Sequence, residues 1–141
     1  MQKFPPLSLY VHIPWCVQKC PYCDFNSHAQ KGTIPEQEYV QHLIADLEAD
    51  LEKYQASIQH RSLHSIFIGG GTPSLFSAES IKLLLAEIQR RIPFSENIEI
   101  TMEANPGTVE AERFKGYVDA GVTRISMGIQ SFNDDKLQRL G

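Results

Sequence analysis

The stretch that decides the fold is LSLYVHIPWCVQKCPYC, residues 7–23, in which an alternating segment leads directly into a loop rich in cysteine. Within residues 7–13, branched apolar side chains alternate with polar ones, among them Tyr10 and His12, which is typical of a β-strand with one buried face. Pro14 ends this strand because it cannot donate a backbone hydrogen bond. The sequence therefore predicts a strand that carries a cysteine loop at its carboxyl end.

The loop contains all the cysteines of the chain, in C-x3-C-x2-C spacing. They are Cys16, Cys20 and Cys23. Thiolates this close repel one another unless a cation neutralises them, and an odd number cannot all form internal disulfides. Three sulfurs suit an iron–sulfur cluster that keeps one iron open. Zinc is the alternative, and it would need Asp24, His12 or His28 as a further ligand. From spacing alone the cluster is favoured.

Three more β-like segments follow, and they alternate with helical ones. Strands are expected over residues 64–68, 98–103 and 124–130, and helices over 36–58, from Ser77, from Thr108 to Gly121 and from Asp134. Four β-α units in series imply parallel strands joined by right-handed crossovers. Both a partial TIM-like (β/α) barrel and a doubly wound sheet have this order of elements.

The composition of the strands favours the barrel. A parallel strand that is buried on both faces reads as nearly continuous apolar sequence, whereas these strands alternate. A sheet with one polar face suits a barrel whose interior holds a ligand. The fold class predicted is therefore α/β, a partial (β/α) barrel with about four units. Four units cannot close a barrel, so we expect residues 1–141 to be the N-terminal part of a larger domain.

The composition and net charge of the chain argue against nucleic acid and membranes as partners. The 141 residues are 42% hydrophobic and 21% charged, with a formal net charge of −4. This charge gives no attraction for nucleic acid or for an anionic membrane surface. No apolar run approaches the roughly 20 residues that a membrane-spanning helix needs, and the first residues lack a signal-peptide pattern. We therefore expect a cytoplasmic location and no integral membrane segment.

Five motifs, taken in order, resemble one known family. They are YVHIPWC at residues 10–16, CPYCDF at 20–25, GGGTPS at 69–74, EANP at 103–106 and RISMGIQSF at 124–132. This set is similar to that of radical S-adenosylmethionine (SAM) proteins. Within that family it most resembles the group of oxygen-independent coproporphyrinogen III oxidases, which includes a branch of heme chaperones.

The resemblance implies two cofactors. Cys16, Cys20 and Cys23 would hold a [4Fe–4S] cluster, and SAM would chelate the open iron through its amino and carboxylate groups. An electron donor such as a flavodoxin or ferredoxin would then reduce the cluster, which can cleave SAM to methionine and a 5′-deoxyadenosyl radical. The cofactors carry this chemistry, while the protein supplies position and electrostatics.

The resemblance also implies a set of SAM contacts. These are Tyr10, Tyr22, Gly70, Gly71, Thr72, Glu103 and Gln130. Each has a structural alternative: Tyr22 could pack under the loop, the glycine run could be an ordinary strand-to-helix turn, and Glu103 could pair with Arg124. His12 could either support the cluster loop or be a hydrogen-bonded histidine inside the barrel, and the sequence favours neither.

The chain departs from the oxidases in two respects. They carry a fourth cysteine shortly after the third, where this chain has Asp24-Phe25-Asn26, and they have a long extension before the residue that matches Tyr10. Both departures favour the heme-chaperone branch, which is thought to bind heme and pass it to acceptor proteins, including respiratory ones. We expect the heme-binding residues beyond Gly141 and no coproporphyrinogen oxidation.

Overall fold

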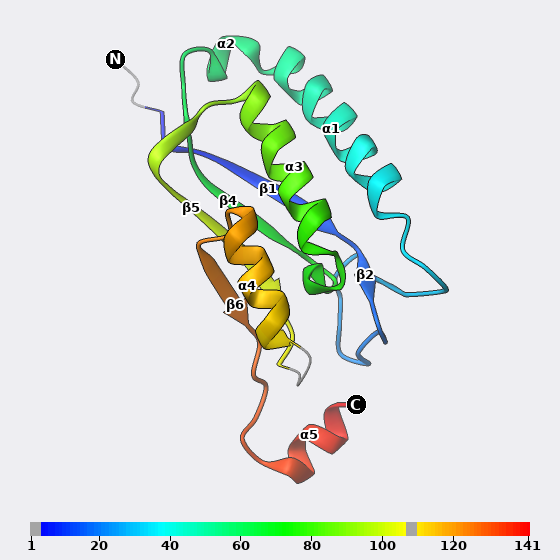
Figure 1. The fold of residues 1–141 in the computed structure, drawn as a ribbon. Helices are drawn as coiled ribbons and strands as arrows, with labels where there is room; N and C mark the ends of the chain where they lie inside the picture. The colour runs from blue at the N-terminus through cyan, green and yellow to red at the C-terminus, as the bar shows by residue number, and fades with distance from the viewer. Residues whose placement is uncertain (1–3, 107–109) are drawn as a thin grey trace.

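The structure is a computed structural model that describes residues 4–106 and 110–141, and its centre is a four-stranded parallel sheet (Figure 1). The strands are β1 (Leu7–Ile13), β4 (Leu63–Gly70), β5 (Phe94–Ala104) and β6 (Arg124–Met127). They lie side by side in the order β1-β4-β5-β6, each parallel to its neighbours. All four carboxyl ends therefore meet at one edge of the sheet. A short parallel pair, β2 (Trp15–Cys16) with β3 (His28–Ala29), lies within the cysteine loop.

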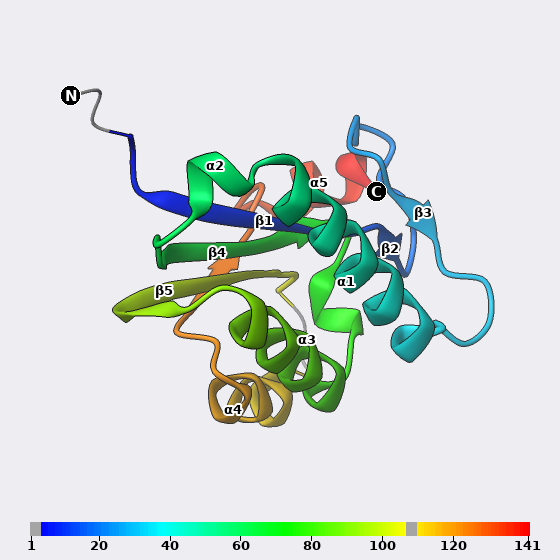
Figure 2. The same cartoon turned by 90° about the horizontal axis from the view of Figure 1, so that it is seen from above.

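Helices connect the strands. They are α1 (Glu36–Lys53), α2 (Gln55–Ile58), the 3-10 helix η1 (Pro73–Leu75), α3 (Ala78–Arg91), α4 (Glu110–Ala120) and α5 (Asp134–Leu140). The longest three, α1, α3 and α4, cover the same face of the sheet, with α3 between the other two (Figures 1 and 2). A doubly wound sheet would carry helices on both faces. The α/β fold with a partial barrel is therefore confirmed.

The core lies between the sheet and these helices. Apolar residues of one parity on the strands are buried there, including Val11, Ile66 and Met102. On the opposite face, Tyr10 and Phe67 are exposed and their rings stack at 6.3 Å. Burial of the apolar face supplies the main driving force for this arrangement, since each large aliphatic side chain contributes about 1.5–3 kcal/mol. The one-sided alternation predicted from the sequence is confirmed.

Several predicted element boundaries are confirmed, and two predictions are wrong. The first strand has the predicted limits, and Ser77 caps α3 by accepting a hydrogen bond from the Ser80 N–H at 3.2 Å. The predicted helix 36–58 is interrupted at Tyr54. The fourth strand ends at Met127 instead of residue 130. Its pairing partner β5 ends opposite that position, at Ala104, so the chain beyond has no strand to continue on.

The second half of the chain shows the same agreement. Gly121 follows α4 with φ of +115°, the conformation that favours glycine at a helix end. The predicted cap at Thr108 lies outside the described residues. Helix α5 begins at Asp134 as expected, and Asn133 caps it by accepting from the Lys136 N–H at 3.1 Å.

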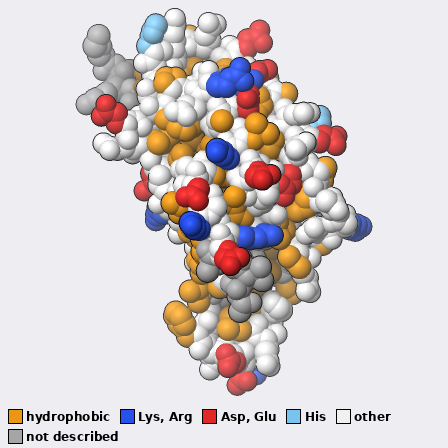
Figure 3. Space-filling view, in the orientation of Figure 1, with side chains coloured by type: hydrophobic (Ala, Val, Ile, Leu, Met, Phe, Trp, Pro, Cys, Tyr) orange, Lys and Arg blue, Asp and Glu red, His pale blue; other side chains and the backbone are white. Residues whose placement is uncertain are grey.

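The outer surface over the helices is mixed in charge. Lys and Arg side chains alternate there with Asp and Glu, and no large patch of one sign stands out in this view (Figure 3). Over residues 4–106 and 110–141, none of the helices combines the length and apolar character needed to cross a membrane.

Candidate functional site

A cavity of about 480 Å³ lies at the carboxyl ends of the strands, beside the cysteine loop. In parallel α/β folds this edge is the usual place for an active site. The residues predicted for the site line this cavity, with the exception of Tyr10. They are Cys16, Cys20, Tyr22, Cys23, Gly70, Gly71, Thr72, Glu103 and Gln130. The fold thus gathers residues from four separate segments of the sequence into one place.

Backbone hydrogen bonds hold the base of the cysteine loop. After Pro14 the chain forms β2, and the return of the loop pairs with it as β3. The His28 N–H donates to the carbonyl of Pro14 at 2.7 Å, and the Gln30 N–H donates to that of Cys16 at 2.6 Å. Trp15 packs against Tyr39 with ring centroids 4.7 Å apart. The start and the return of the loop are therefore held together by the β2–β3 pair, next to the end of β1.

His12 connects this loop to the first strand. Its Nε2 lies 2.7 Å from the carbonyl oxygen of Asn26, and its Nδ1 lies 2.7 Å from the hydroxyl of Tyr10. Because a carbonyl can only accept, Nε2 carries a proton, and in the neutral ring Nδ1 accepts from the Tyr10 hydroxyl. The sequence analysis gave two alternatives for His12, and its contacts agree with both. His12 is a hydrogen-bonded histidine on the inner face of the sheet, and it also supports the return of the cysteine loop.

The three thiols are partly exposed and none forms a disulfide. The Cys23 N–H donates to the carbonyl of Cys20 at 3.1 Å, so the last two cysteines share one tight turn. The Tyr22 side chain is about half exposed. Its hydrogen bond to Cys20 raises the pKa of its hydroxyl, with further contributions from burial and from the charges of Cys20 and Cys23. Tyr22 thus stands beside the sulfurs and does not pack under the loop.

The glycine run at the end of β4 is required by the protein's own packing. Gly70 has φ of +119°, and a Cβ there would approach the His12 ring to 2.8 Å. A Cβ at Gly71 would lie only 2.6 Å from the carbonyl oxygen of Trp15. The Gly71 N–H donates to the carbonyl of Ile13 at 2.8 Å, and the Thr72 N–H donates to that of Trp15 at 2.7 Å. The glycines therefore let the loop approach the strand end closely.

Glu103 does not pair with Arg124, the structural partner that the sequence analysis considered for it. Its Oε2 accepts a hydrogen bond from the Gly70 N–H at 3.2 Å. Arg124 instead contacts Glu99, with Nη1 and Oε1 3.1 Å apart, so the structural pairing of Glu103 with Arg124 is wrong. The half-buried carboxylate of Glu103 faces the cavity.

Tyr10 and Gln130 lie less centrally than the cysteines. Tyr10 is outside the cavity lining and is more than half exposed, but burial and the negative charge of Glu103 both raise the pKa of its hydroxyl. It reaches the loop through His12. Gln130 lines the cavity from the segment that follows β6, beyond the strand in which the sequence analysis placed it.

Some residues at the site were not found from the sequence. Asn26 takes part through its backbone carbonyl, and a backbone atom leaves no sequence signal. Ser27 is buried, with its Oγ 3.6 Å from the sulfur of Cys23. The Nδ2 of Asn105 donates to the Thr72 hydroxyl at 3.2 Å. A polar residue four positions after a cysteine could have been a signal for Ser27.

Two observations bear on the choice between a cluster and a single zinc ion. In the part of the chain that the structure describes, no three side chains of His, Cys, Asp or Glu are arranged to hold one ion. Recruiting His12 to zinc would break its hydrogen bonds to Tyr10 and Asn26. A cluster would place each protein sulfur on a separate iron, and Cys16, Cys20 and Cys23 all line this one cavity.

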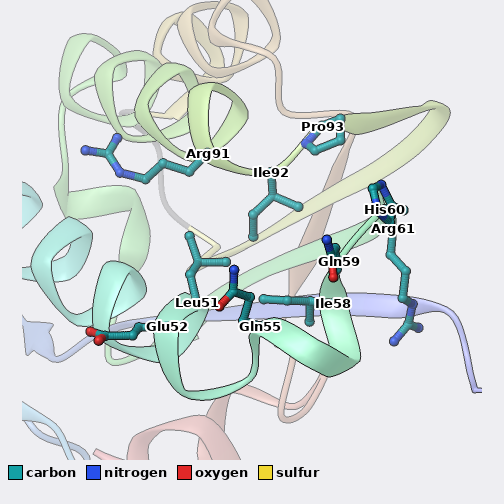
Figure 4. Close-up of a pocket in the computed structure, with 10 residues that line it drawn as sticks. All are labelled: Leu51, Glu52, Gln55, Ile58, Gln59, His60, Arg61, Arg91, Ile92 and Pro93. Carbon is teal, nitrogen blue, oxygen red and sulfur yellow. The ribbon is translucent and has the colours of Figure 1, made fainter.

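A second hollow of about 500 Å³ lies at the opposite edge of the sheet, near the amino ends of β4 and β5. Figure 4 shows its apolar side chains Leu51, Ile58 and Ile92 directed toward one another, whereas Arg61 and Arg91 extend away. Arg91 already pairs with Glu48 and Glu87, and Arg61 donates to backbone carbonyls. Both arginines of this hollow are therefore already engaged within the protein.

Curated proteins that are similar in sequence share one name. The chain is 78% identical to a protein named "Heme chaperone HemW" from Haemophilus influenzae, over 100% of this chain and 37% of that protein. Proteins of the same name from Escherichia coli and Bacillus subtilis are 61% and 41% identical, over 100% and 95% of this chain and 36% and 34% of theirs. The chain therefore spans little more than a third of these relatives.

A solved structure shares the fold. It is the coproporphyrinogen III oxidase HemN from Escherichia coli, described as a radical SAM enzyme, with a TM-score of 0.76 and 28% sequence identity. The alignment covers 96% of this chain and 30% of that chain. In addition, the family profile of the radical SAM superfamily matches residues 10–141, which include the cysteine loop and every strand end that lines the cavity. The chain belongs to the radical SAM superfamily.

Proposed function

We propose that residues 1–141 form the first part of the core domain of a heme chaperone that binds a [4Fe–4S] cluster and SAM. The observation that carries this proposal is the 78% identity to a heme chaperone over the whole chain, with the cysteine loop facing one cavity. The likeness to the oxidase structure, at 28% identity, supports the fold and the cofactors more than the reaction.

Cys16, Cys20 and Cys23 would hold the cluster, and their partial exposure lets the irons reach them. With only three protein sulfurs, one iron keeps an open position for a ligand. When bound and reduced, the cluster supplies the electron that cleaves SAM. The residues of the chain bind and orient the cofactors and limit the access of water.

The strand ends would recognise the polar groups of SAM. The N–H groups of Gly70, Gly71 and Thr72 already donate within the protein, so this stretch would offer carbonyl oxygens, which suit an ammonium group. Glu103 would add a negative charge near that ammonium group or accept from hydroxyls. Gln130 can both donate and accept, as a contact to a ribose or a carboxylate requires. Tyr22 would lie against SAM beside Cys20, and Tyr10 would act from the margin of the site.

The rival function is oxidation of coproporphyrinogen III, the activity named for the structural relative. Where the resemblance to the oxidases calls for a fourth cysteine, this chain has Asp24-Phe25-Asn26. The identity to the heme chaperones is also much higher than to the oxidase. The chaperone would take heme as cargo, pass it to an acceptor protein and receive electrons from a flavodoxin or ferredoxin.

The test uses the full-length protein with its cluster assembled under anaerobic conditions. Heme titration is run beside an assay that contains SAM, a reductant and coproporphyrinogen III. We expect heme binding close to stoichiometric amounts and no formation of protoporphyrinogen IX. Sustained turnover of coproporphyrinogen III, with HemN as the positive control, would overturn the chaperone function in favour of the oxidase.

A further inference from the structure

Ser27 carries a buried hydroxyl group beside one of the cysteine sulfurs. The residue is 2% exposed, and its Oγ lies 3.6 Å from Sγ of Cys23. The other acceptor within reach is the carbonyl oxygen of Phe25 at 3.4 Å, which is long for an O–H···O bond, whose usual distance is about 2.7–2.8 Å. The hydroxyl proton is therefore held only weakly by the backbone.

The backbone on both sides of Ser27 is tied to the end of β1. The preceding residue, Asn26, accepts from Nε2 of His12 at 2.7 Å. The following residue, His28, donates to the carbonyl of Pro14 at 2.7 Å. Because both neighbours are tied and Ser27 itself is only 2% exposed, its hydroxyl is held in an enclosed position beside Cys23. Such support by surrounding hydrogen bonds is what holds a site in a defined geometry.

The chemistry of Cys23 decides which acceptor the hydroxyl prefers. A cysteine that holds iron does so as a thiolate, and a hydrogen bond to a charged acceptor is stronger than one to a neutral carbonyl. The buried Ser27 hydroxyl is itself shielded from water that could compete for its proton. The hydroxyl of Tyr22, beside Cys20, is in contrast half exposed, so water can substitute for it there.

We propose that Ser27 donates a hydrogen bond to the Cys23 thiolate when the cluster is bound and thereby raises the reduction potential of the cluster. This inference rests on the proposed function, because it requires the cluster on Cys16, Cys20 and Cys23. Reduction adds negative charge to the cluster, and hydrogen bonds to its sulfurs stabilise that charge. Ser27 is thus a tuning residue that does not itself bind iron.

The test is a redox titration of the reduced cluster followed by electron paramagnetic resonance, on the full-length protein. Ser27→Ala should shift the equilibrium against reduction about tenfold, which corresponds to 59 mV for a one-electron couple. Ser8→Ala is the matched control, since this exposed serine bonds to Ser65 at 2.8 Å at the far end of the sheet. The control should titrate like the parent protein.

Ser27→Thr is the second variant, because it keeps the hydroxyl group. The proposal is supported if the reduction equilibrium of the Ser27→Thr cluster stays within about twofold of the parent while that of Ser27→Ala shifts as stated. A Ser27→Ala protein with the parental potential overturns it. If Ser27→Ala cannot hold the cluster, the Ser27→Thr variant is the deciding measurement. A Ser27→Thr protein that keeps the cluster at the parental potential supports the hydrogen bond from the hydroxyl. Loss of the cluster from both variants overturns it, because the side chain then matters for packing at this position and not for its hydroxyl group. A parent protein that forms no cluster would instead contradict the proposed function.

Discussion

Oε2 of Glu103 accepts a hydrogen bond from the backbone N–H of Gly70 across 3.2 Å, which joins the carboxyl end of β5 to that of β4. The two residues are 33 positions apart in the sequence and both line the cavity beside the cysteines. The carboxylate is therefore held by neutral backbone, and no cation of the chain pairs with it among the described residues. Its negative charge remains available to a positively charged ligand.

Replacing this charge should weaken the binding of SAM without removing the cluster. Glu103→Gln keeps the shape and an oxygen acceptor for Gly70 but removes the charge. Because hydrogen bonds to charged groups contribute about 1.5–3 kcal/mol, we expect SAM affinity to fall by about tenfold or more. The measurement is the change that SAM causes in the paramagnetic resonance spectrum of the reduced cluster.

Glu99→Gln is the control for this variant. Glu99 lies on the same strand, but it is exposed and pairs with Arg124, outside the cavity. The Glu99→Gln variant should bind SAM like the parent protein. Equal SAM affinity for Glu103→Gln and Glu99→Gln would show that Glu103 has no part in SAM binding.

Each cysteine of the loop should be necessary for the cluster. Replacing Cys16, Cys20 or Cys23 by alanine leaves two sulfurs for three irons, so reconstitution with iron and sulfide should give little or none of the parental absorbance. Asp24→Asn is the control, because Asp24 is one of the residues that a zinc site could recruit and a cluster would not need it. Stoichiometric zinc and no iron in the anaerobically purified full-length protein would refute the cluster.

Loss of the His12 ring should destabilise the cysteine loop. His12→Ala removes the hydrogen bonds to Asn26 and Tyr10, each with a net contribution of about 0.5–1.5 kcal/mol. We expect a chelator to extract iron several times faster from this variant. Tyr10→Phe removes only one of these bonds and should have a smaller effect. Extraction at the parental rate from His12→Ala would mean that the loop does not depend on this histidine.

The close approach at Gly71 should be sensitive to a single methyl group. Gly71→Ala places a Cβ 2.6 Å from the Trp15 carbonyl oxygen, and backbone must move to accept it. We expect the free energy of unfolding to fall by about 1–3 kcal/mol. Gly32→Ala is the comparison variant: it meets no atom within 4 Å, so its cost comes only from the backbone φ of +74°, whereas the cost at Gly71 comes from the close contact. If thermal unfolding shows Gly71→Ala to be as stable as the parent, the packing at this point is looser than described.

Local patterns in the sequence were enough for the four strands of the sheet, for the main helices and for their order. Alternation within residues 7–13 predicted β1 and its buried face, and Ser77 and Gly121 predicted a helix start and a helix end. These features depend on neighbouring residues, whose side-chain periodicity and capping chemistry are visible in one dimension. The fourth strand was predicted too long because its end depends on β5, a distant partner.

By itself, the sequence determined that parallel β-α units carry a loop of three cysteines, and that polar side chains collect at the strand ends. Only the tertiary structure decided which of these groups touch. Glu103 bonds to Gly70 and not to Arg124, Tyr10 stays at the margin, and Ser27 lies against Cys23. The physical reason is that these contacts involve backbone atoms and segments brought together by sheet pairing. Neither leaves a pattern in the order of the side chains along the chain.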